Sequence, residues 1–279
     1  MLKRIITSIF ALAVLIPALF LSGTWVFPIA LAIVSVMCLF EMFRCMGIHK
    51  NIALTLPLYA FALAFPILQR LFSNDMYVAI IAFMAGCVYI IYAFALIVWS
   101  HGKLAYNNIT SVCLTSFYIL IAINMILYIR DFGESGQFIY LLIFIGAWVT
   151  DIFAYFTGVF FGKHKLIEDV SPKKTIEGSI GGTVFCALAF ILMGIIAREF
   201  FGREANLLFL AISGVIMSIV AQIGDLILSV IKRHYGIKDF GKIFPGHGGM
   251  LDRFDSLMAV TLGVALMCMF SYITGIPLM

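Results

Sequence analysis

Long, nearly uninterrupted apolar blocks are the feature that most restricts the fold of this 279-residue chain. A helix needs about 20 apolar residues to cross a hydrocarbon core about 30 Å thick, because each residue advances about 1.5 Å. About nine such spans are predicted, near residues 5–22, 25–45, 52–72, 76–99, 108–129, 137–161, 179–197, 206–231 and 254–275. The sequence therefore predicts an all-α, polytopic integral membrane protein.

The composition excludes a soluble fold. Hydrophobic residues make up 63% of the chain and charged residues only 11%, whereas soluble domains carry about 25% charged residues. The first span follows Lys3 and Arg4, as the apolar core of a signal peptide does. No small-x-small cleavage site follows it and many more spans do, so we expect a retained helix.

The positions of the basic residues predict the orientation. If the N-terminus is cytoplasmic, the outer loops hold only four of the 18 lysines and arginines, namely Arg70, Arg130, Arg198 and Arg203. Because cytoplasmic loops carry an excess of Lys and Arg, we expect this orientation. The same bias accounts for the net charge of +4 and gives no reason to expect nucleic acid as a partner.

Polar residues concentrate in the second half of the chain. We therefore divide it into about five N-terminal spans over residues 1–136 and a catalytic region over residues 137–279. The catalytic region has two long cytoplasmic loops, at 162–178 and 232–253. In the first half the one intramembrane acid is Glu41, which we expect at headgroup level rather than in a proton path.

Acidic residues inside the later spans mark a candidate site. An acid within a span costs roughly 2.5–3.5 kcal/mol, so it usually faces a cavity or a partner. Asp225, Ser229 and Lys232 are spaced i, i+4 and i+7, which places them on one helical face. Asp252 and Asp255 follow at the start of the last span. We expect Asp225 and Asp252 to meet at the same membrane face.

This combination of carboxylates, cations and glycines is typical of phosphoryl or nucleotidyl transfer. Mg²⁺ favours one or two carboxylates plus phosphate oxygens and water, and basic side chains hold the remaining phosphate charge. The glycines of residues 244–249 allow close approach of an anion. His247 among them fits a metal ligand, a general base, a phosphate donor or a turn residue. Taken singly, Asp225 fits a simple ion pair and the basic loops fit contact with anionic lipid.

The spacing in this region carries a resemblance. The polar residues run Ser229-Val-Ile-Lys232-Arg233, then Lys238-Asp239-Phe-Gly241, then Pro245-Gly-His247-Gly248-Gly249-Met-Leu-Asp252-Arg253-Phe-Asp255. These 27 residues resemble the signature of the phosphatidate cytidylyltransferases, also called CDP-diacylglycerol synthases. The segment from Asp151 to Gly178 is similar to that family's other polar region.

The resemblance implies a reaction and its partners. CTP and bilayer phosphatidate would give CDP-diacylglycerol and pyrophosphate, in phospholipid biosynthesis. The enzyme would be a homodimer among membrane lipids, with its site on the cytoplasmic face of a bacterial inner membrane. Mg²⁺ would be the cofactor, and a second, monovalent ion is left open.

The resemblance also assigns roles to residues. The predicted metal ligands are Asp225 and Asp252, with Asp255 as a further ligand or a support. The predicted catalytic residues are Asp225, Asp252, Lys232, Arg253 and His247. The predicted substrate-binding residues are Ser171, Lys173, Lys174, Ser229, Arg233, Lys238, Gly248 and Gly249.

Two further assignments concern the earlier polar segment, residues 151–178. Ser171 and Pro172 are expected to start a short helix that brings Lys173 and Lys174 over a phosphate. Asp151 either orients one of these lysines or joins the metal site, and its sequence position does not decide between the two.

Other functions fit parts of the pattern. An ion-coupled transporter or channel also carries intramembrane acids, although we would expect them near the bilayer midplane with polar residues on both faces. A related lipid kinase, or an enzyme acting on a prenyl- or ether-linked phospholipid, would use the same phosphate-binding residues.

Overall fold

The chain is an all-α membrane protein with one small hairpin. The computed structural model describes residues 13, 15–72, 76–101, 104–244, 246 and 248–279. Among these, eight helices are long and apolar enough to cross a membrane, and they match the predicted spans from 25–45 onward. Most of the first predicted span, 5–22, lies outside the described residues. The predicted fold class is confirmed, and the orientation in the membrane stays a prediction.

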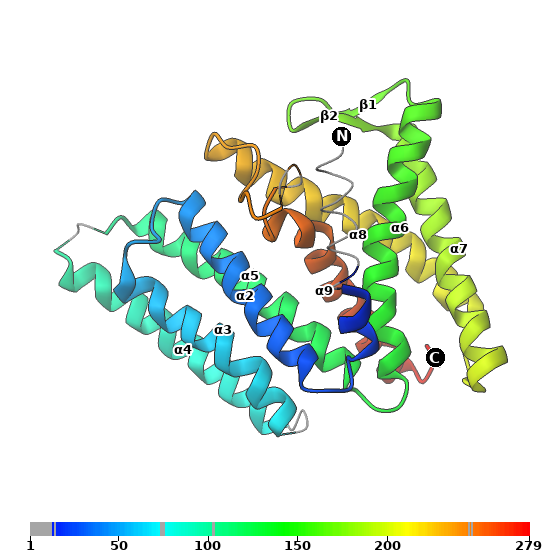
Figure 1. Cartoon of the computed structure of the whole chain (residues 1–279), viewed down its shortest axis with the longest axis horizontal. Helices are drawn as coiled ribbons and strands as arrows, with labels where there is room; N and C mark the ends of the chain where they lie inside the picture. The colour runs from blue at the N-terminus through cyan, green and yellow to red at the C-terminus, as the bar shows by residue number, and fades with distance from the viewer. Residues whose placement is uncertain (1–12, 14, 73–75, 102–103, 245, 247) are drawn as a thin grey trace. The chain divides into compact units, whose positions relative to one another are not determined.

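The elements follow one another as Figure 1 labels them. In chain order they are α2 (Val26–Cys45), α3 (Ile52–Leu71), α4 (Met76–Trp99), α5 (Tyr106–Arg130), α6 (Gly136–Phe161), β1 (Lys165–Ile167), β2 (Ser171–Thr175), α7 (Ile176–Phe201), α8 (Leu207–His234) and α9 (Leu251–Thr274).

Two compact units make up the chain. The first unit contains the described residues up to Asp131 and also Ile237–Arg253, the connection between α8 and α9. The second unit contains Phe132–Gly236 and Phe254–Met279. The first residues of α9 therefore belong to the first unit, and the rest of α9 belongs to the second unit, where it packs against α6 and α8. The predicted functional division at residues 136 and 137 stays a prediction.

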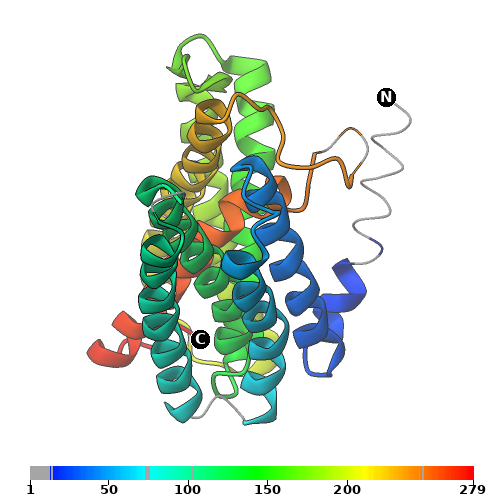
Figure 2. The ribbon, with the colours of Figure 1, turned by 90° about the vertical axis from the view of Figure 1, so that its left-hand side faces the viewer.

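Helices α2 to α5 of the first unit run beside one another (Figure 2). Pro57 interrupts the hydrogen bonding of α3, because proline has no N–H to donate to the carbonyl four residues earlier. That carbonyl, of Ala53, instead accepts a 2.9 Å hydrogen bond from the Tyr92 hydroxyl of α4. A neighbouring helix thus satisfies the group that the proline leaves open, as membrane helices require.

Small residues bring the helices of the second unit close together. A Cβ on Gly178 of α7 would stand 2.6 Å from the Ala154 carbonyl oxygen of α6. A Cβ on Gly182, one turn later, would stand 2.8 Å from the Thr150 carbonyl oxygen. Pairs of small residues four apart are typical of tightly packed membrane helices. This packing fixes the polar end of α6 directly beside the start of α7.

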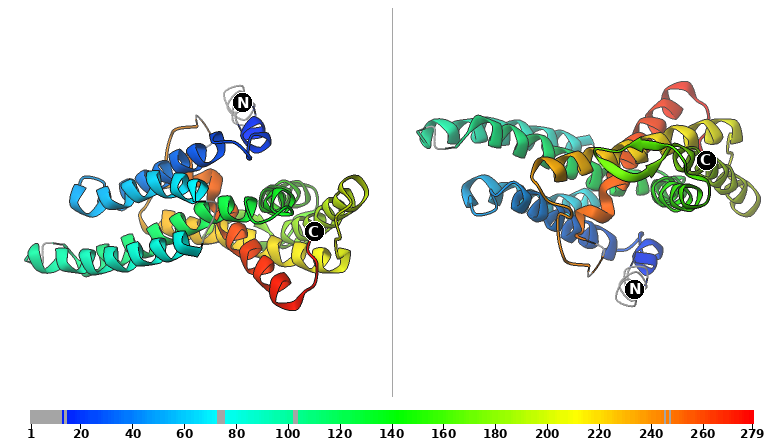
Figure 3. Two further views of the ribbon diagram at one scale, coloured as in Figure 1. Left: turned by 90° about the horizontal axis from the view of Figure 1, so that it is seen from below. Right: turned by 90° about the horizontal axis from the view of Figure 1, so that it is seen from above.

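A two-stranded antiparallel hairpin connects α6 to α7 and lies at the ends of these helices (Figure 3). The prediction that Ser171 and Pro172 start a short helix is wrong: they begin β2, and Ser171 pairs with Ile167. The helix begins only at Ile176, because the Thr175 side chain accepts the Gly178 N–H and caps it. The hairpin therefore carries Lys173 and Lys174 on a strand.

Candidate active site

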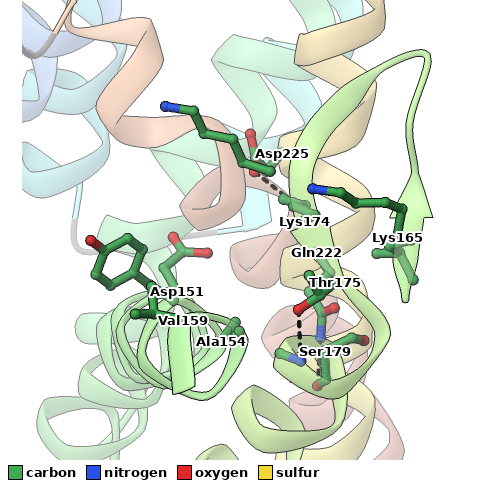
Figure 4. Close-up of a pocket in the computed structure, with 14 residues that line it drawn as sticks. Asp151, Ala154, Val159, Lys165, Lys174, Thr175, Ser179, Gln222 and Asp225 are labelled. Atoms are coloured by element: carbon green, nitrogen blue, oxygen red, sulfur yellow. Dashed lines mark hydrogen bonds and ion pairs between the residues drawn. The ribbon is translucent and has the colours of Figure 1, made fainter. Parts of the chain in front are cut away.

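A cavity of about 610 Å³ opens in the second unit, within the range of ligand-binding pockets. Residues of α6, of the hairpin, of the first turn of α7 and of α8 line it. They are Asp151, Ala154, Tyr155, Gly158, Val159, Lys165, Leu166, Lys173, Lys174, Thr175, Gly178, Ser179, Gln222 and Asp225. Asp151 and Lys165 point into it from opposite sides (Figure 4). The cavity thus combines acids, three lysines and apolar wall.

Asp225 lies at the centre of the polar contacts. Its Oδ2 atom is 2.6 Å from the Lys174 ammonium nitrogen of β2. The hydroxyl of Ser229, one turn later on α8, donates to Oδ1 at 3.4 Å, so the predicted i, i+4 contact forms. Asp255 on α9 also lies close by: a Cβ on Gly224, the residue before Asp225, would stand 3.1 Å from the Asp255 carbonyl oxygen, and the two carboxylates interact electrostatically. Residues from β2, α8 and α9 therefore converge on this carboxylate.

A third acid completes the cluster. Asp151 on α6 accepts a 3.0 Å hydrogen bond from the Ser256 hydroxyl, next to Asp255. Asp255 lies within electrostatic range of Asp225, Asp151 and the buried Lys232. Carboxylates within electrostatic range repel one another unless cations or protons compensate their charge. Asp151 therefore lies near these acids, and its two alternative roles, orienting a lysine or joining a metal site, stay predictions.

The donor chemistry fits Mg²⁺. In the described part of the chain, no three His, Cys, Asp or Glu side chains form a complete metal-binding group. A Mg²⁺ site needs only one or two carboxylates, because phosphate oxygens and waters supply the other ligands. Asp225 and Asp255 provide two neighbouring carboxylates, and the ammonium of Lys174 shows that a cation is accommodated beside Asp225.

A row of hydrogen-bonded polar side chains between α7 and α8 continues from the cavity wall, starting at Gln222. The Gln222 amide nitrogen lies within 3.3–3.5 Å of the Ser179 carbonyl, the Thr183 hydroxyl and the Ser218 hydroxyl. Ser179, Thr183 and Ser218 were not among the predicted site residues. Ser179 and Thr183 are spaced i, i+4 on α7, as are Ser218 and Gln222 on α8, and this spacing is the sequence signal of one polar face on each helix.

Asp252 lies in the first unit, where it organises the connection before α9. Its Oδ2 accepts the backbone N–H of Phe240 at 2.8 Å and of Gly249 at 2.9 Å. Gly248 adopts a positive φ of 86°, which other residues rarely adopt. Shared ligation of a metal by Asp225 and Asp252 stays a prediction.

The remaining predicted residues differ in exposure. Ser171 is half-buried on β2, and Lys173 is exposed on the same strand. Arg233, Lys238 and Arg253 are exposed. His247 lies outside the described residues.

Glu41 is buried within the first unit, since only 1% of the residue is exposed. Its predicted position at headgroup level stays a prediction. Its carboxylate accepts the backbone N–H groups of Met250 and Leu251 at the start of α9. An isolated acid near the end of an apolar helix carried no sequence signal for a partner 209 residues away.

Comparison with known proteins identifies the family. A sequence model of the cytidylyltransferase family matches residues 2–271, nearly the whole chain. The chain belongs to the cytidylyltransferase family. It is therefore an enzyme, a nucleotidyltransferase, as the resemblance implied.

Curated relatives in this family are named phosphatidate cytidylyltransferase. One from Staphylococcus epidermidis (strain RP62A) is 33% identical over 261 residues, covering 92% of this chain and 95% of the relative. One from Staphylococcus haemolyticus is 35% identical over 264 residues, with the same coverage. One from Staphylococcus aureus (strain COL) is 41% identical over 172 residues, covering 60% of this chain and 64% of the relative. The similarity extends into the N-terminal spans, beyond the motifs that first indicated the family.

Proposed function

We propose that this chain transfers the cytidylyl group of CTP to phosphatidate. A phosphate oxygen of phosphatidate bonds to the α-phosphorus of CTP, the bond from that phosphorus to the β-phosphate oxygen breaks, and pyrophosphate leaves. The products are CDP-diacylglycerol and pyrophosphate. The names of relatives aligned over more than nine-tenths of the chain support this acceptor.

The observation that carries the proposal is a polar cavity whose wall continues onto an exposed apolar surface of a candidate membrane-spanning helix. Tyr155 and Val159 of α6 both line the cavity and are largely exposed, within a helix long and apolar enough to cross a membrane. An apolar tail beside α6 therefore leaves its phosphate next to Asp151, Lys165 and Lys173 of the same cavity. A soluble acceptor would not need this apolar wall.

The acids and lysines divide the work of bringing two polyanions together. Asp225 and Asp255 would hold Mg²⁺, and we keep Asp252 as a predicted further ligand. Bound Mg²⁺ supplies positive charge that neutralises phosphate oxygens in the transition state. Lys165 and Lys173, both exposed in the cavity wall, would hold phosphate oxygens of CTP and of the leaving pyrophosphate. Because the attacking phosphate oxygen is already anionic, no side chain has to act as a strong base.

We also propose the cellular location of the site. The site would face the cytoplasm from a bacterial inner membrane, because the loops at 162–178 and 232–253 are rich in lysine and arginine. CTP is available on that side. A homodimer remains our expectation from the resemblance.

The test is an assay of the purified full-length protein in detergent. Labelled CTP and phosphatidate should give CDP-diacylglycerol in a Mg²⁺-dependent way. Asp225→Asn and Asp255→Asn should each reduce turnover by about 100-fold or more, since each removes charge from the site. Asp169→Asn is the matched control, because Asp169 is an exposed hairpin acid outside the cavity lining. Near-normal turnover in both site variants would refute the assignment.

Two further arms separate the other functions. A panel of prenyl- and ether-linked phospholipid acceptors measures whether phosphatidate is preferred. Reconstitution in liposomes measures substrate flux, and transport without any CTP turnover would favour the transporter instead.

A further inference from the structure

The N-terminal helix α2 holds the connection between α8 and α9 through one buried carboxylate. Glu41 Oε1 accepts the Met250 N–H at 3.0 Å, and Oε2 accepts the Leu251 N–H at 2.8 Å. Leu251 is the first residue of α9, whose leading N–H groups have no partner within the helix. A negative charge at this end is also favoured by the helix dipole. Glu41 therefore fills the anion position at the start of α9.

Other contacts fix the same connection, which we call the α8–α9 loop (residues 237–250). Arg44, one turn after Glu41 on α2, donates to the Phe240 carbonyl at 2.9 Å. Asp252 accepts the Phe240 and Gly249 N–H groups. The carboxylates of Glu41 and Asp252 thus accept hydrogen bonds from four backbone N–H groups, and Arg44 donates one to a backbone carbonyl. Since unpaired buried N–H groups are costly, these contacts select one loop conformation.

The glycines of the loop allow its backbone to close around Glu41. A Cβ on Gly241 or on Gly249 would collide with the Glu41 carboxylate. The sequence suggested that glycines in this turn approach a substrate anion. The anion that Gly241 and Gly249 approach in the structure is the carboxylate of Glu41 itself.

We propose that Glu41 is a positioning residue for the cytidylyl transfer, an inference that rests on the proposed function. Glu41 holds both the α8–α9 loop, which carries Lys238, and the start of α9. The start of α9 carries Arg253 and Asp255. The backbone of Asp255 lies against Gly224, next to Asp225, so the direction in which α9 starts sets the geometry of the two carboxylates. Glu41 acts through the loop and the helix, and it has no role in contacting substrate.

Three variants of Glu41 and one control test this. Glu41→Ala removes both acceptors, and Glu41→Gln retains one carbonyl oxygen for two N–H groups. Glu41→Asp keeps the charge on a shorter side chain. Ser35→Ala is the control, because Ser35 is equally buried on α2 but bonds only to Leu31 of its own helix among the contacts described. Each variant is purified in detergent, and rates are expressed per folded molecule after size-exclusion chromatography.

Displacement of reacting groups by about 1 Å costs about 100-fold in rate, so kcat/KM should fall about 100-fold in Glu41→Ala. Glu41→Asp should retain more activity than Glu41→Gln, and Ser35→Ala should match the wild type. Hydrogen exchange should become faster in peptides covering residues 237–253 and stay unchanged in α5. A merely structural role predicts less folded protein but the same kcat and KM per folded molecule.

The outcomes separate the two proposals. If the wild type makes no CDP-diacylglycerol, the proposed function fails, while faster exchange of the loop in Glu41→Ala would still establish the anchor. If the wild type is active and the Glu41 variants keep its kcat/KM, or lose it without any change in loop exchange, the positioning role is overturned. If Glu41→Ala does not fold, Glu41→Gln and Glu41→Asp are compared instead. Lower kcat/KM and faster loop exchange in Glu41→Gln than in Glu41→Asp would support the positioning role, and equal values would overturn it.

Discussion

Substitution of Lys174 by alanine should change metal dependence and turnover in opposite ways. The Lys174 ammonium lies 2.6 Å from Asp225 Oδ2, where a bound cation would compete with it. Two unit charges at that separation attract by about 6 kcal/mol at an effective dielectric constant of 20. Both side chains are about one-quarter exposed, so screening and desolvation reduce the net attraction to about 1–2 kcal/mol.

The magnitude sets the expected shift. Because 1.4 kcal/mol corresponds to a factor of ten, the Mg²⁺ concentration for half-maximal activity should fall about 10-fold in Lys174→Ala. Turnover at saturating Mg²⁺ should fall by about 10²-fold, since a cation that stabilises phosphate charge in the transition state is lost. The affinity for Mg²⁺ should therefore rise while turnover falls, and general damage to the fold would not raise the affinity.

The assay is formation of labelled CDP-diacylglycerol across a Mg²⁺ titration. Thermal unfolding across the same titration gives a second readout, and its half-saturation should shift in the same direction. Lys163→Ala is the control, because Lys163 is an exposed lysine beside the hairpin that does not line the cavity. An unchanged Mg²⁺ midpoint would refute the competition between Lys174 and a metal ion, whatever the turnover.

Two further predictions concern stability, measured by thermal unfolding in detergent. Gly178→Ala should destabilise the second unit by about 1–3 kcal/mol, because its Cβ would press on the backbone oxygen of Ala154; Gly86→Ala, where the nearest atoms are 3.9 Å away, should be neutral. Arg70→Ala should cost about 2 kcal/mol, because Arg70 pairs with Asp131 at 2.9 Å and both side chains are 15% exposed. Equal stability of the two glycine variants, or an unaffected Arg70→Ala, would contradict these assignments.

Features that depend on a single helix were predictable from the sequence. The spans from 25–45 onward follow from local hydropathy, and the Asp225–Ser229 contact follows from the i, i+4 geometry of any α-helix. Errors arose where two local signals competed. Ser171-Pro172 fits a helix start, yet pairing of Ser171 with Ile167 and the cap provided by Thr175 move the start to Ile176.

Partners between helices were not predictable. The basic loops offered several lysines to Asp225, and the strand geometry of β2 selected Lys174. Glu41 looked like an isolated acid because its partners are backbone N–H groups, which every residue except proline has and which no sequence pattern marks.

The sequence by itself determined that this chain is a bundle of membrane helices with a polar region suited to binding phosphate. Both features depend only on residues that are close together in the sequence, through the length of apolar segments and the spacing of polar residues along a helix. Only the tertiary structure decided where each buried charge is compensated. A carboxylate in a low-dielectric interior is stable only where donors or cations reach it, and packing sets which ones do. That packing placed Asp255 and Lys174 on Asp225, and it brought the start of α9 onto Glu41.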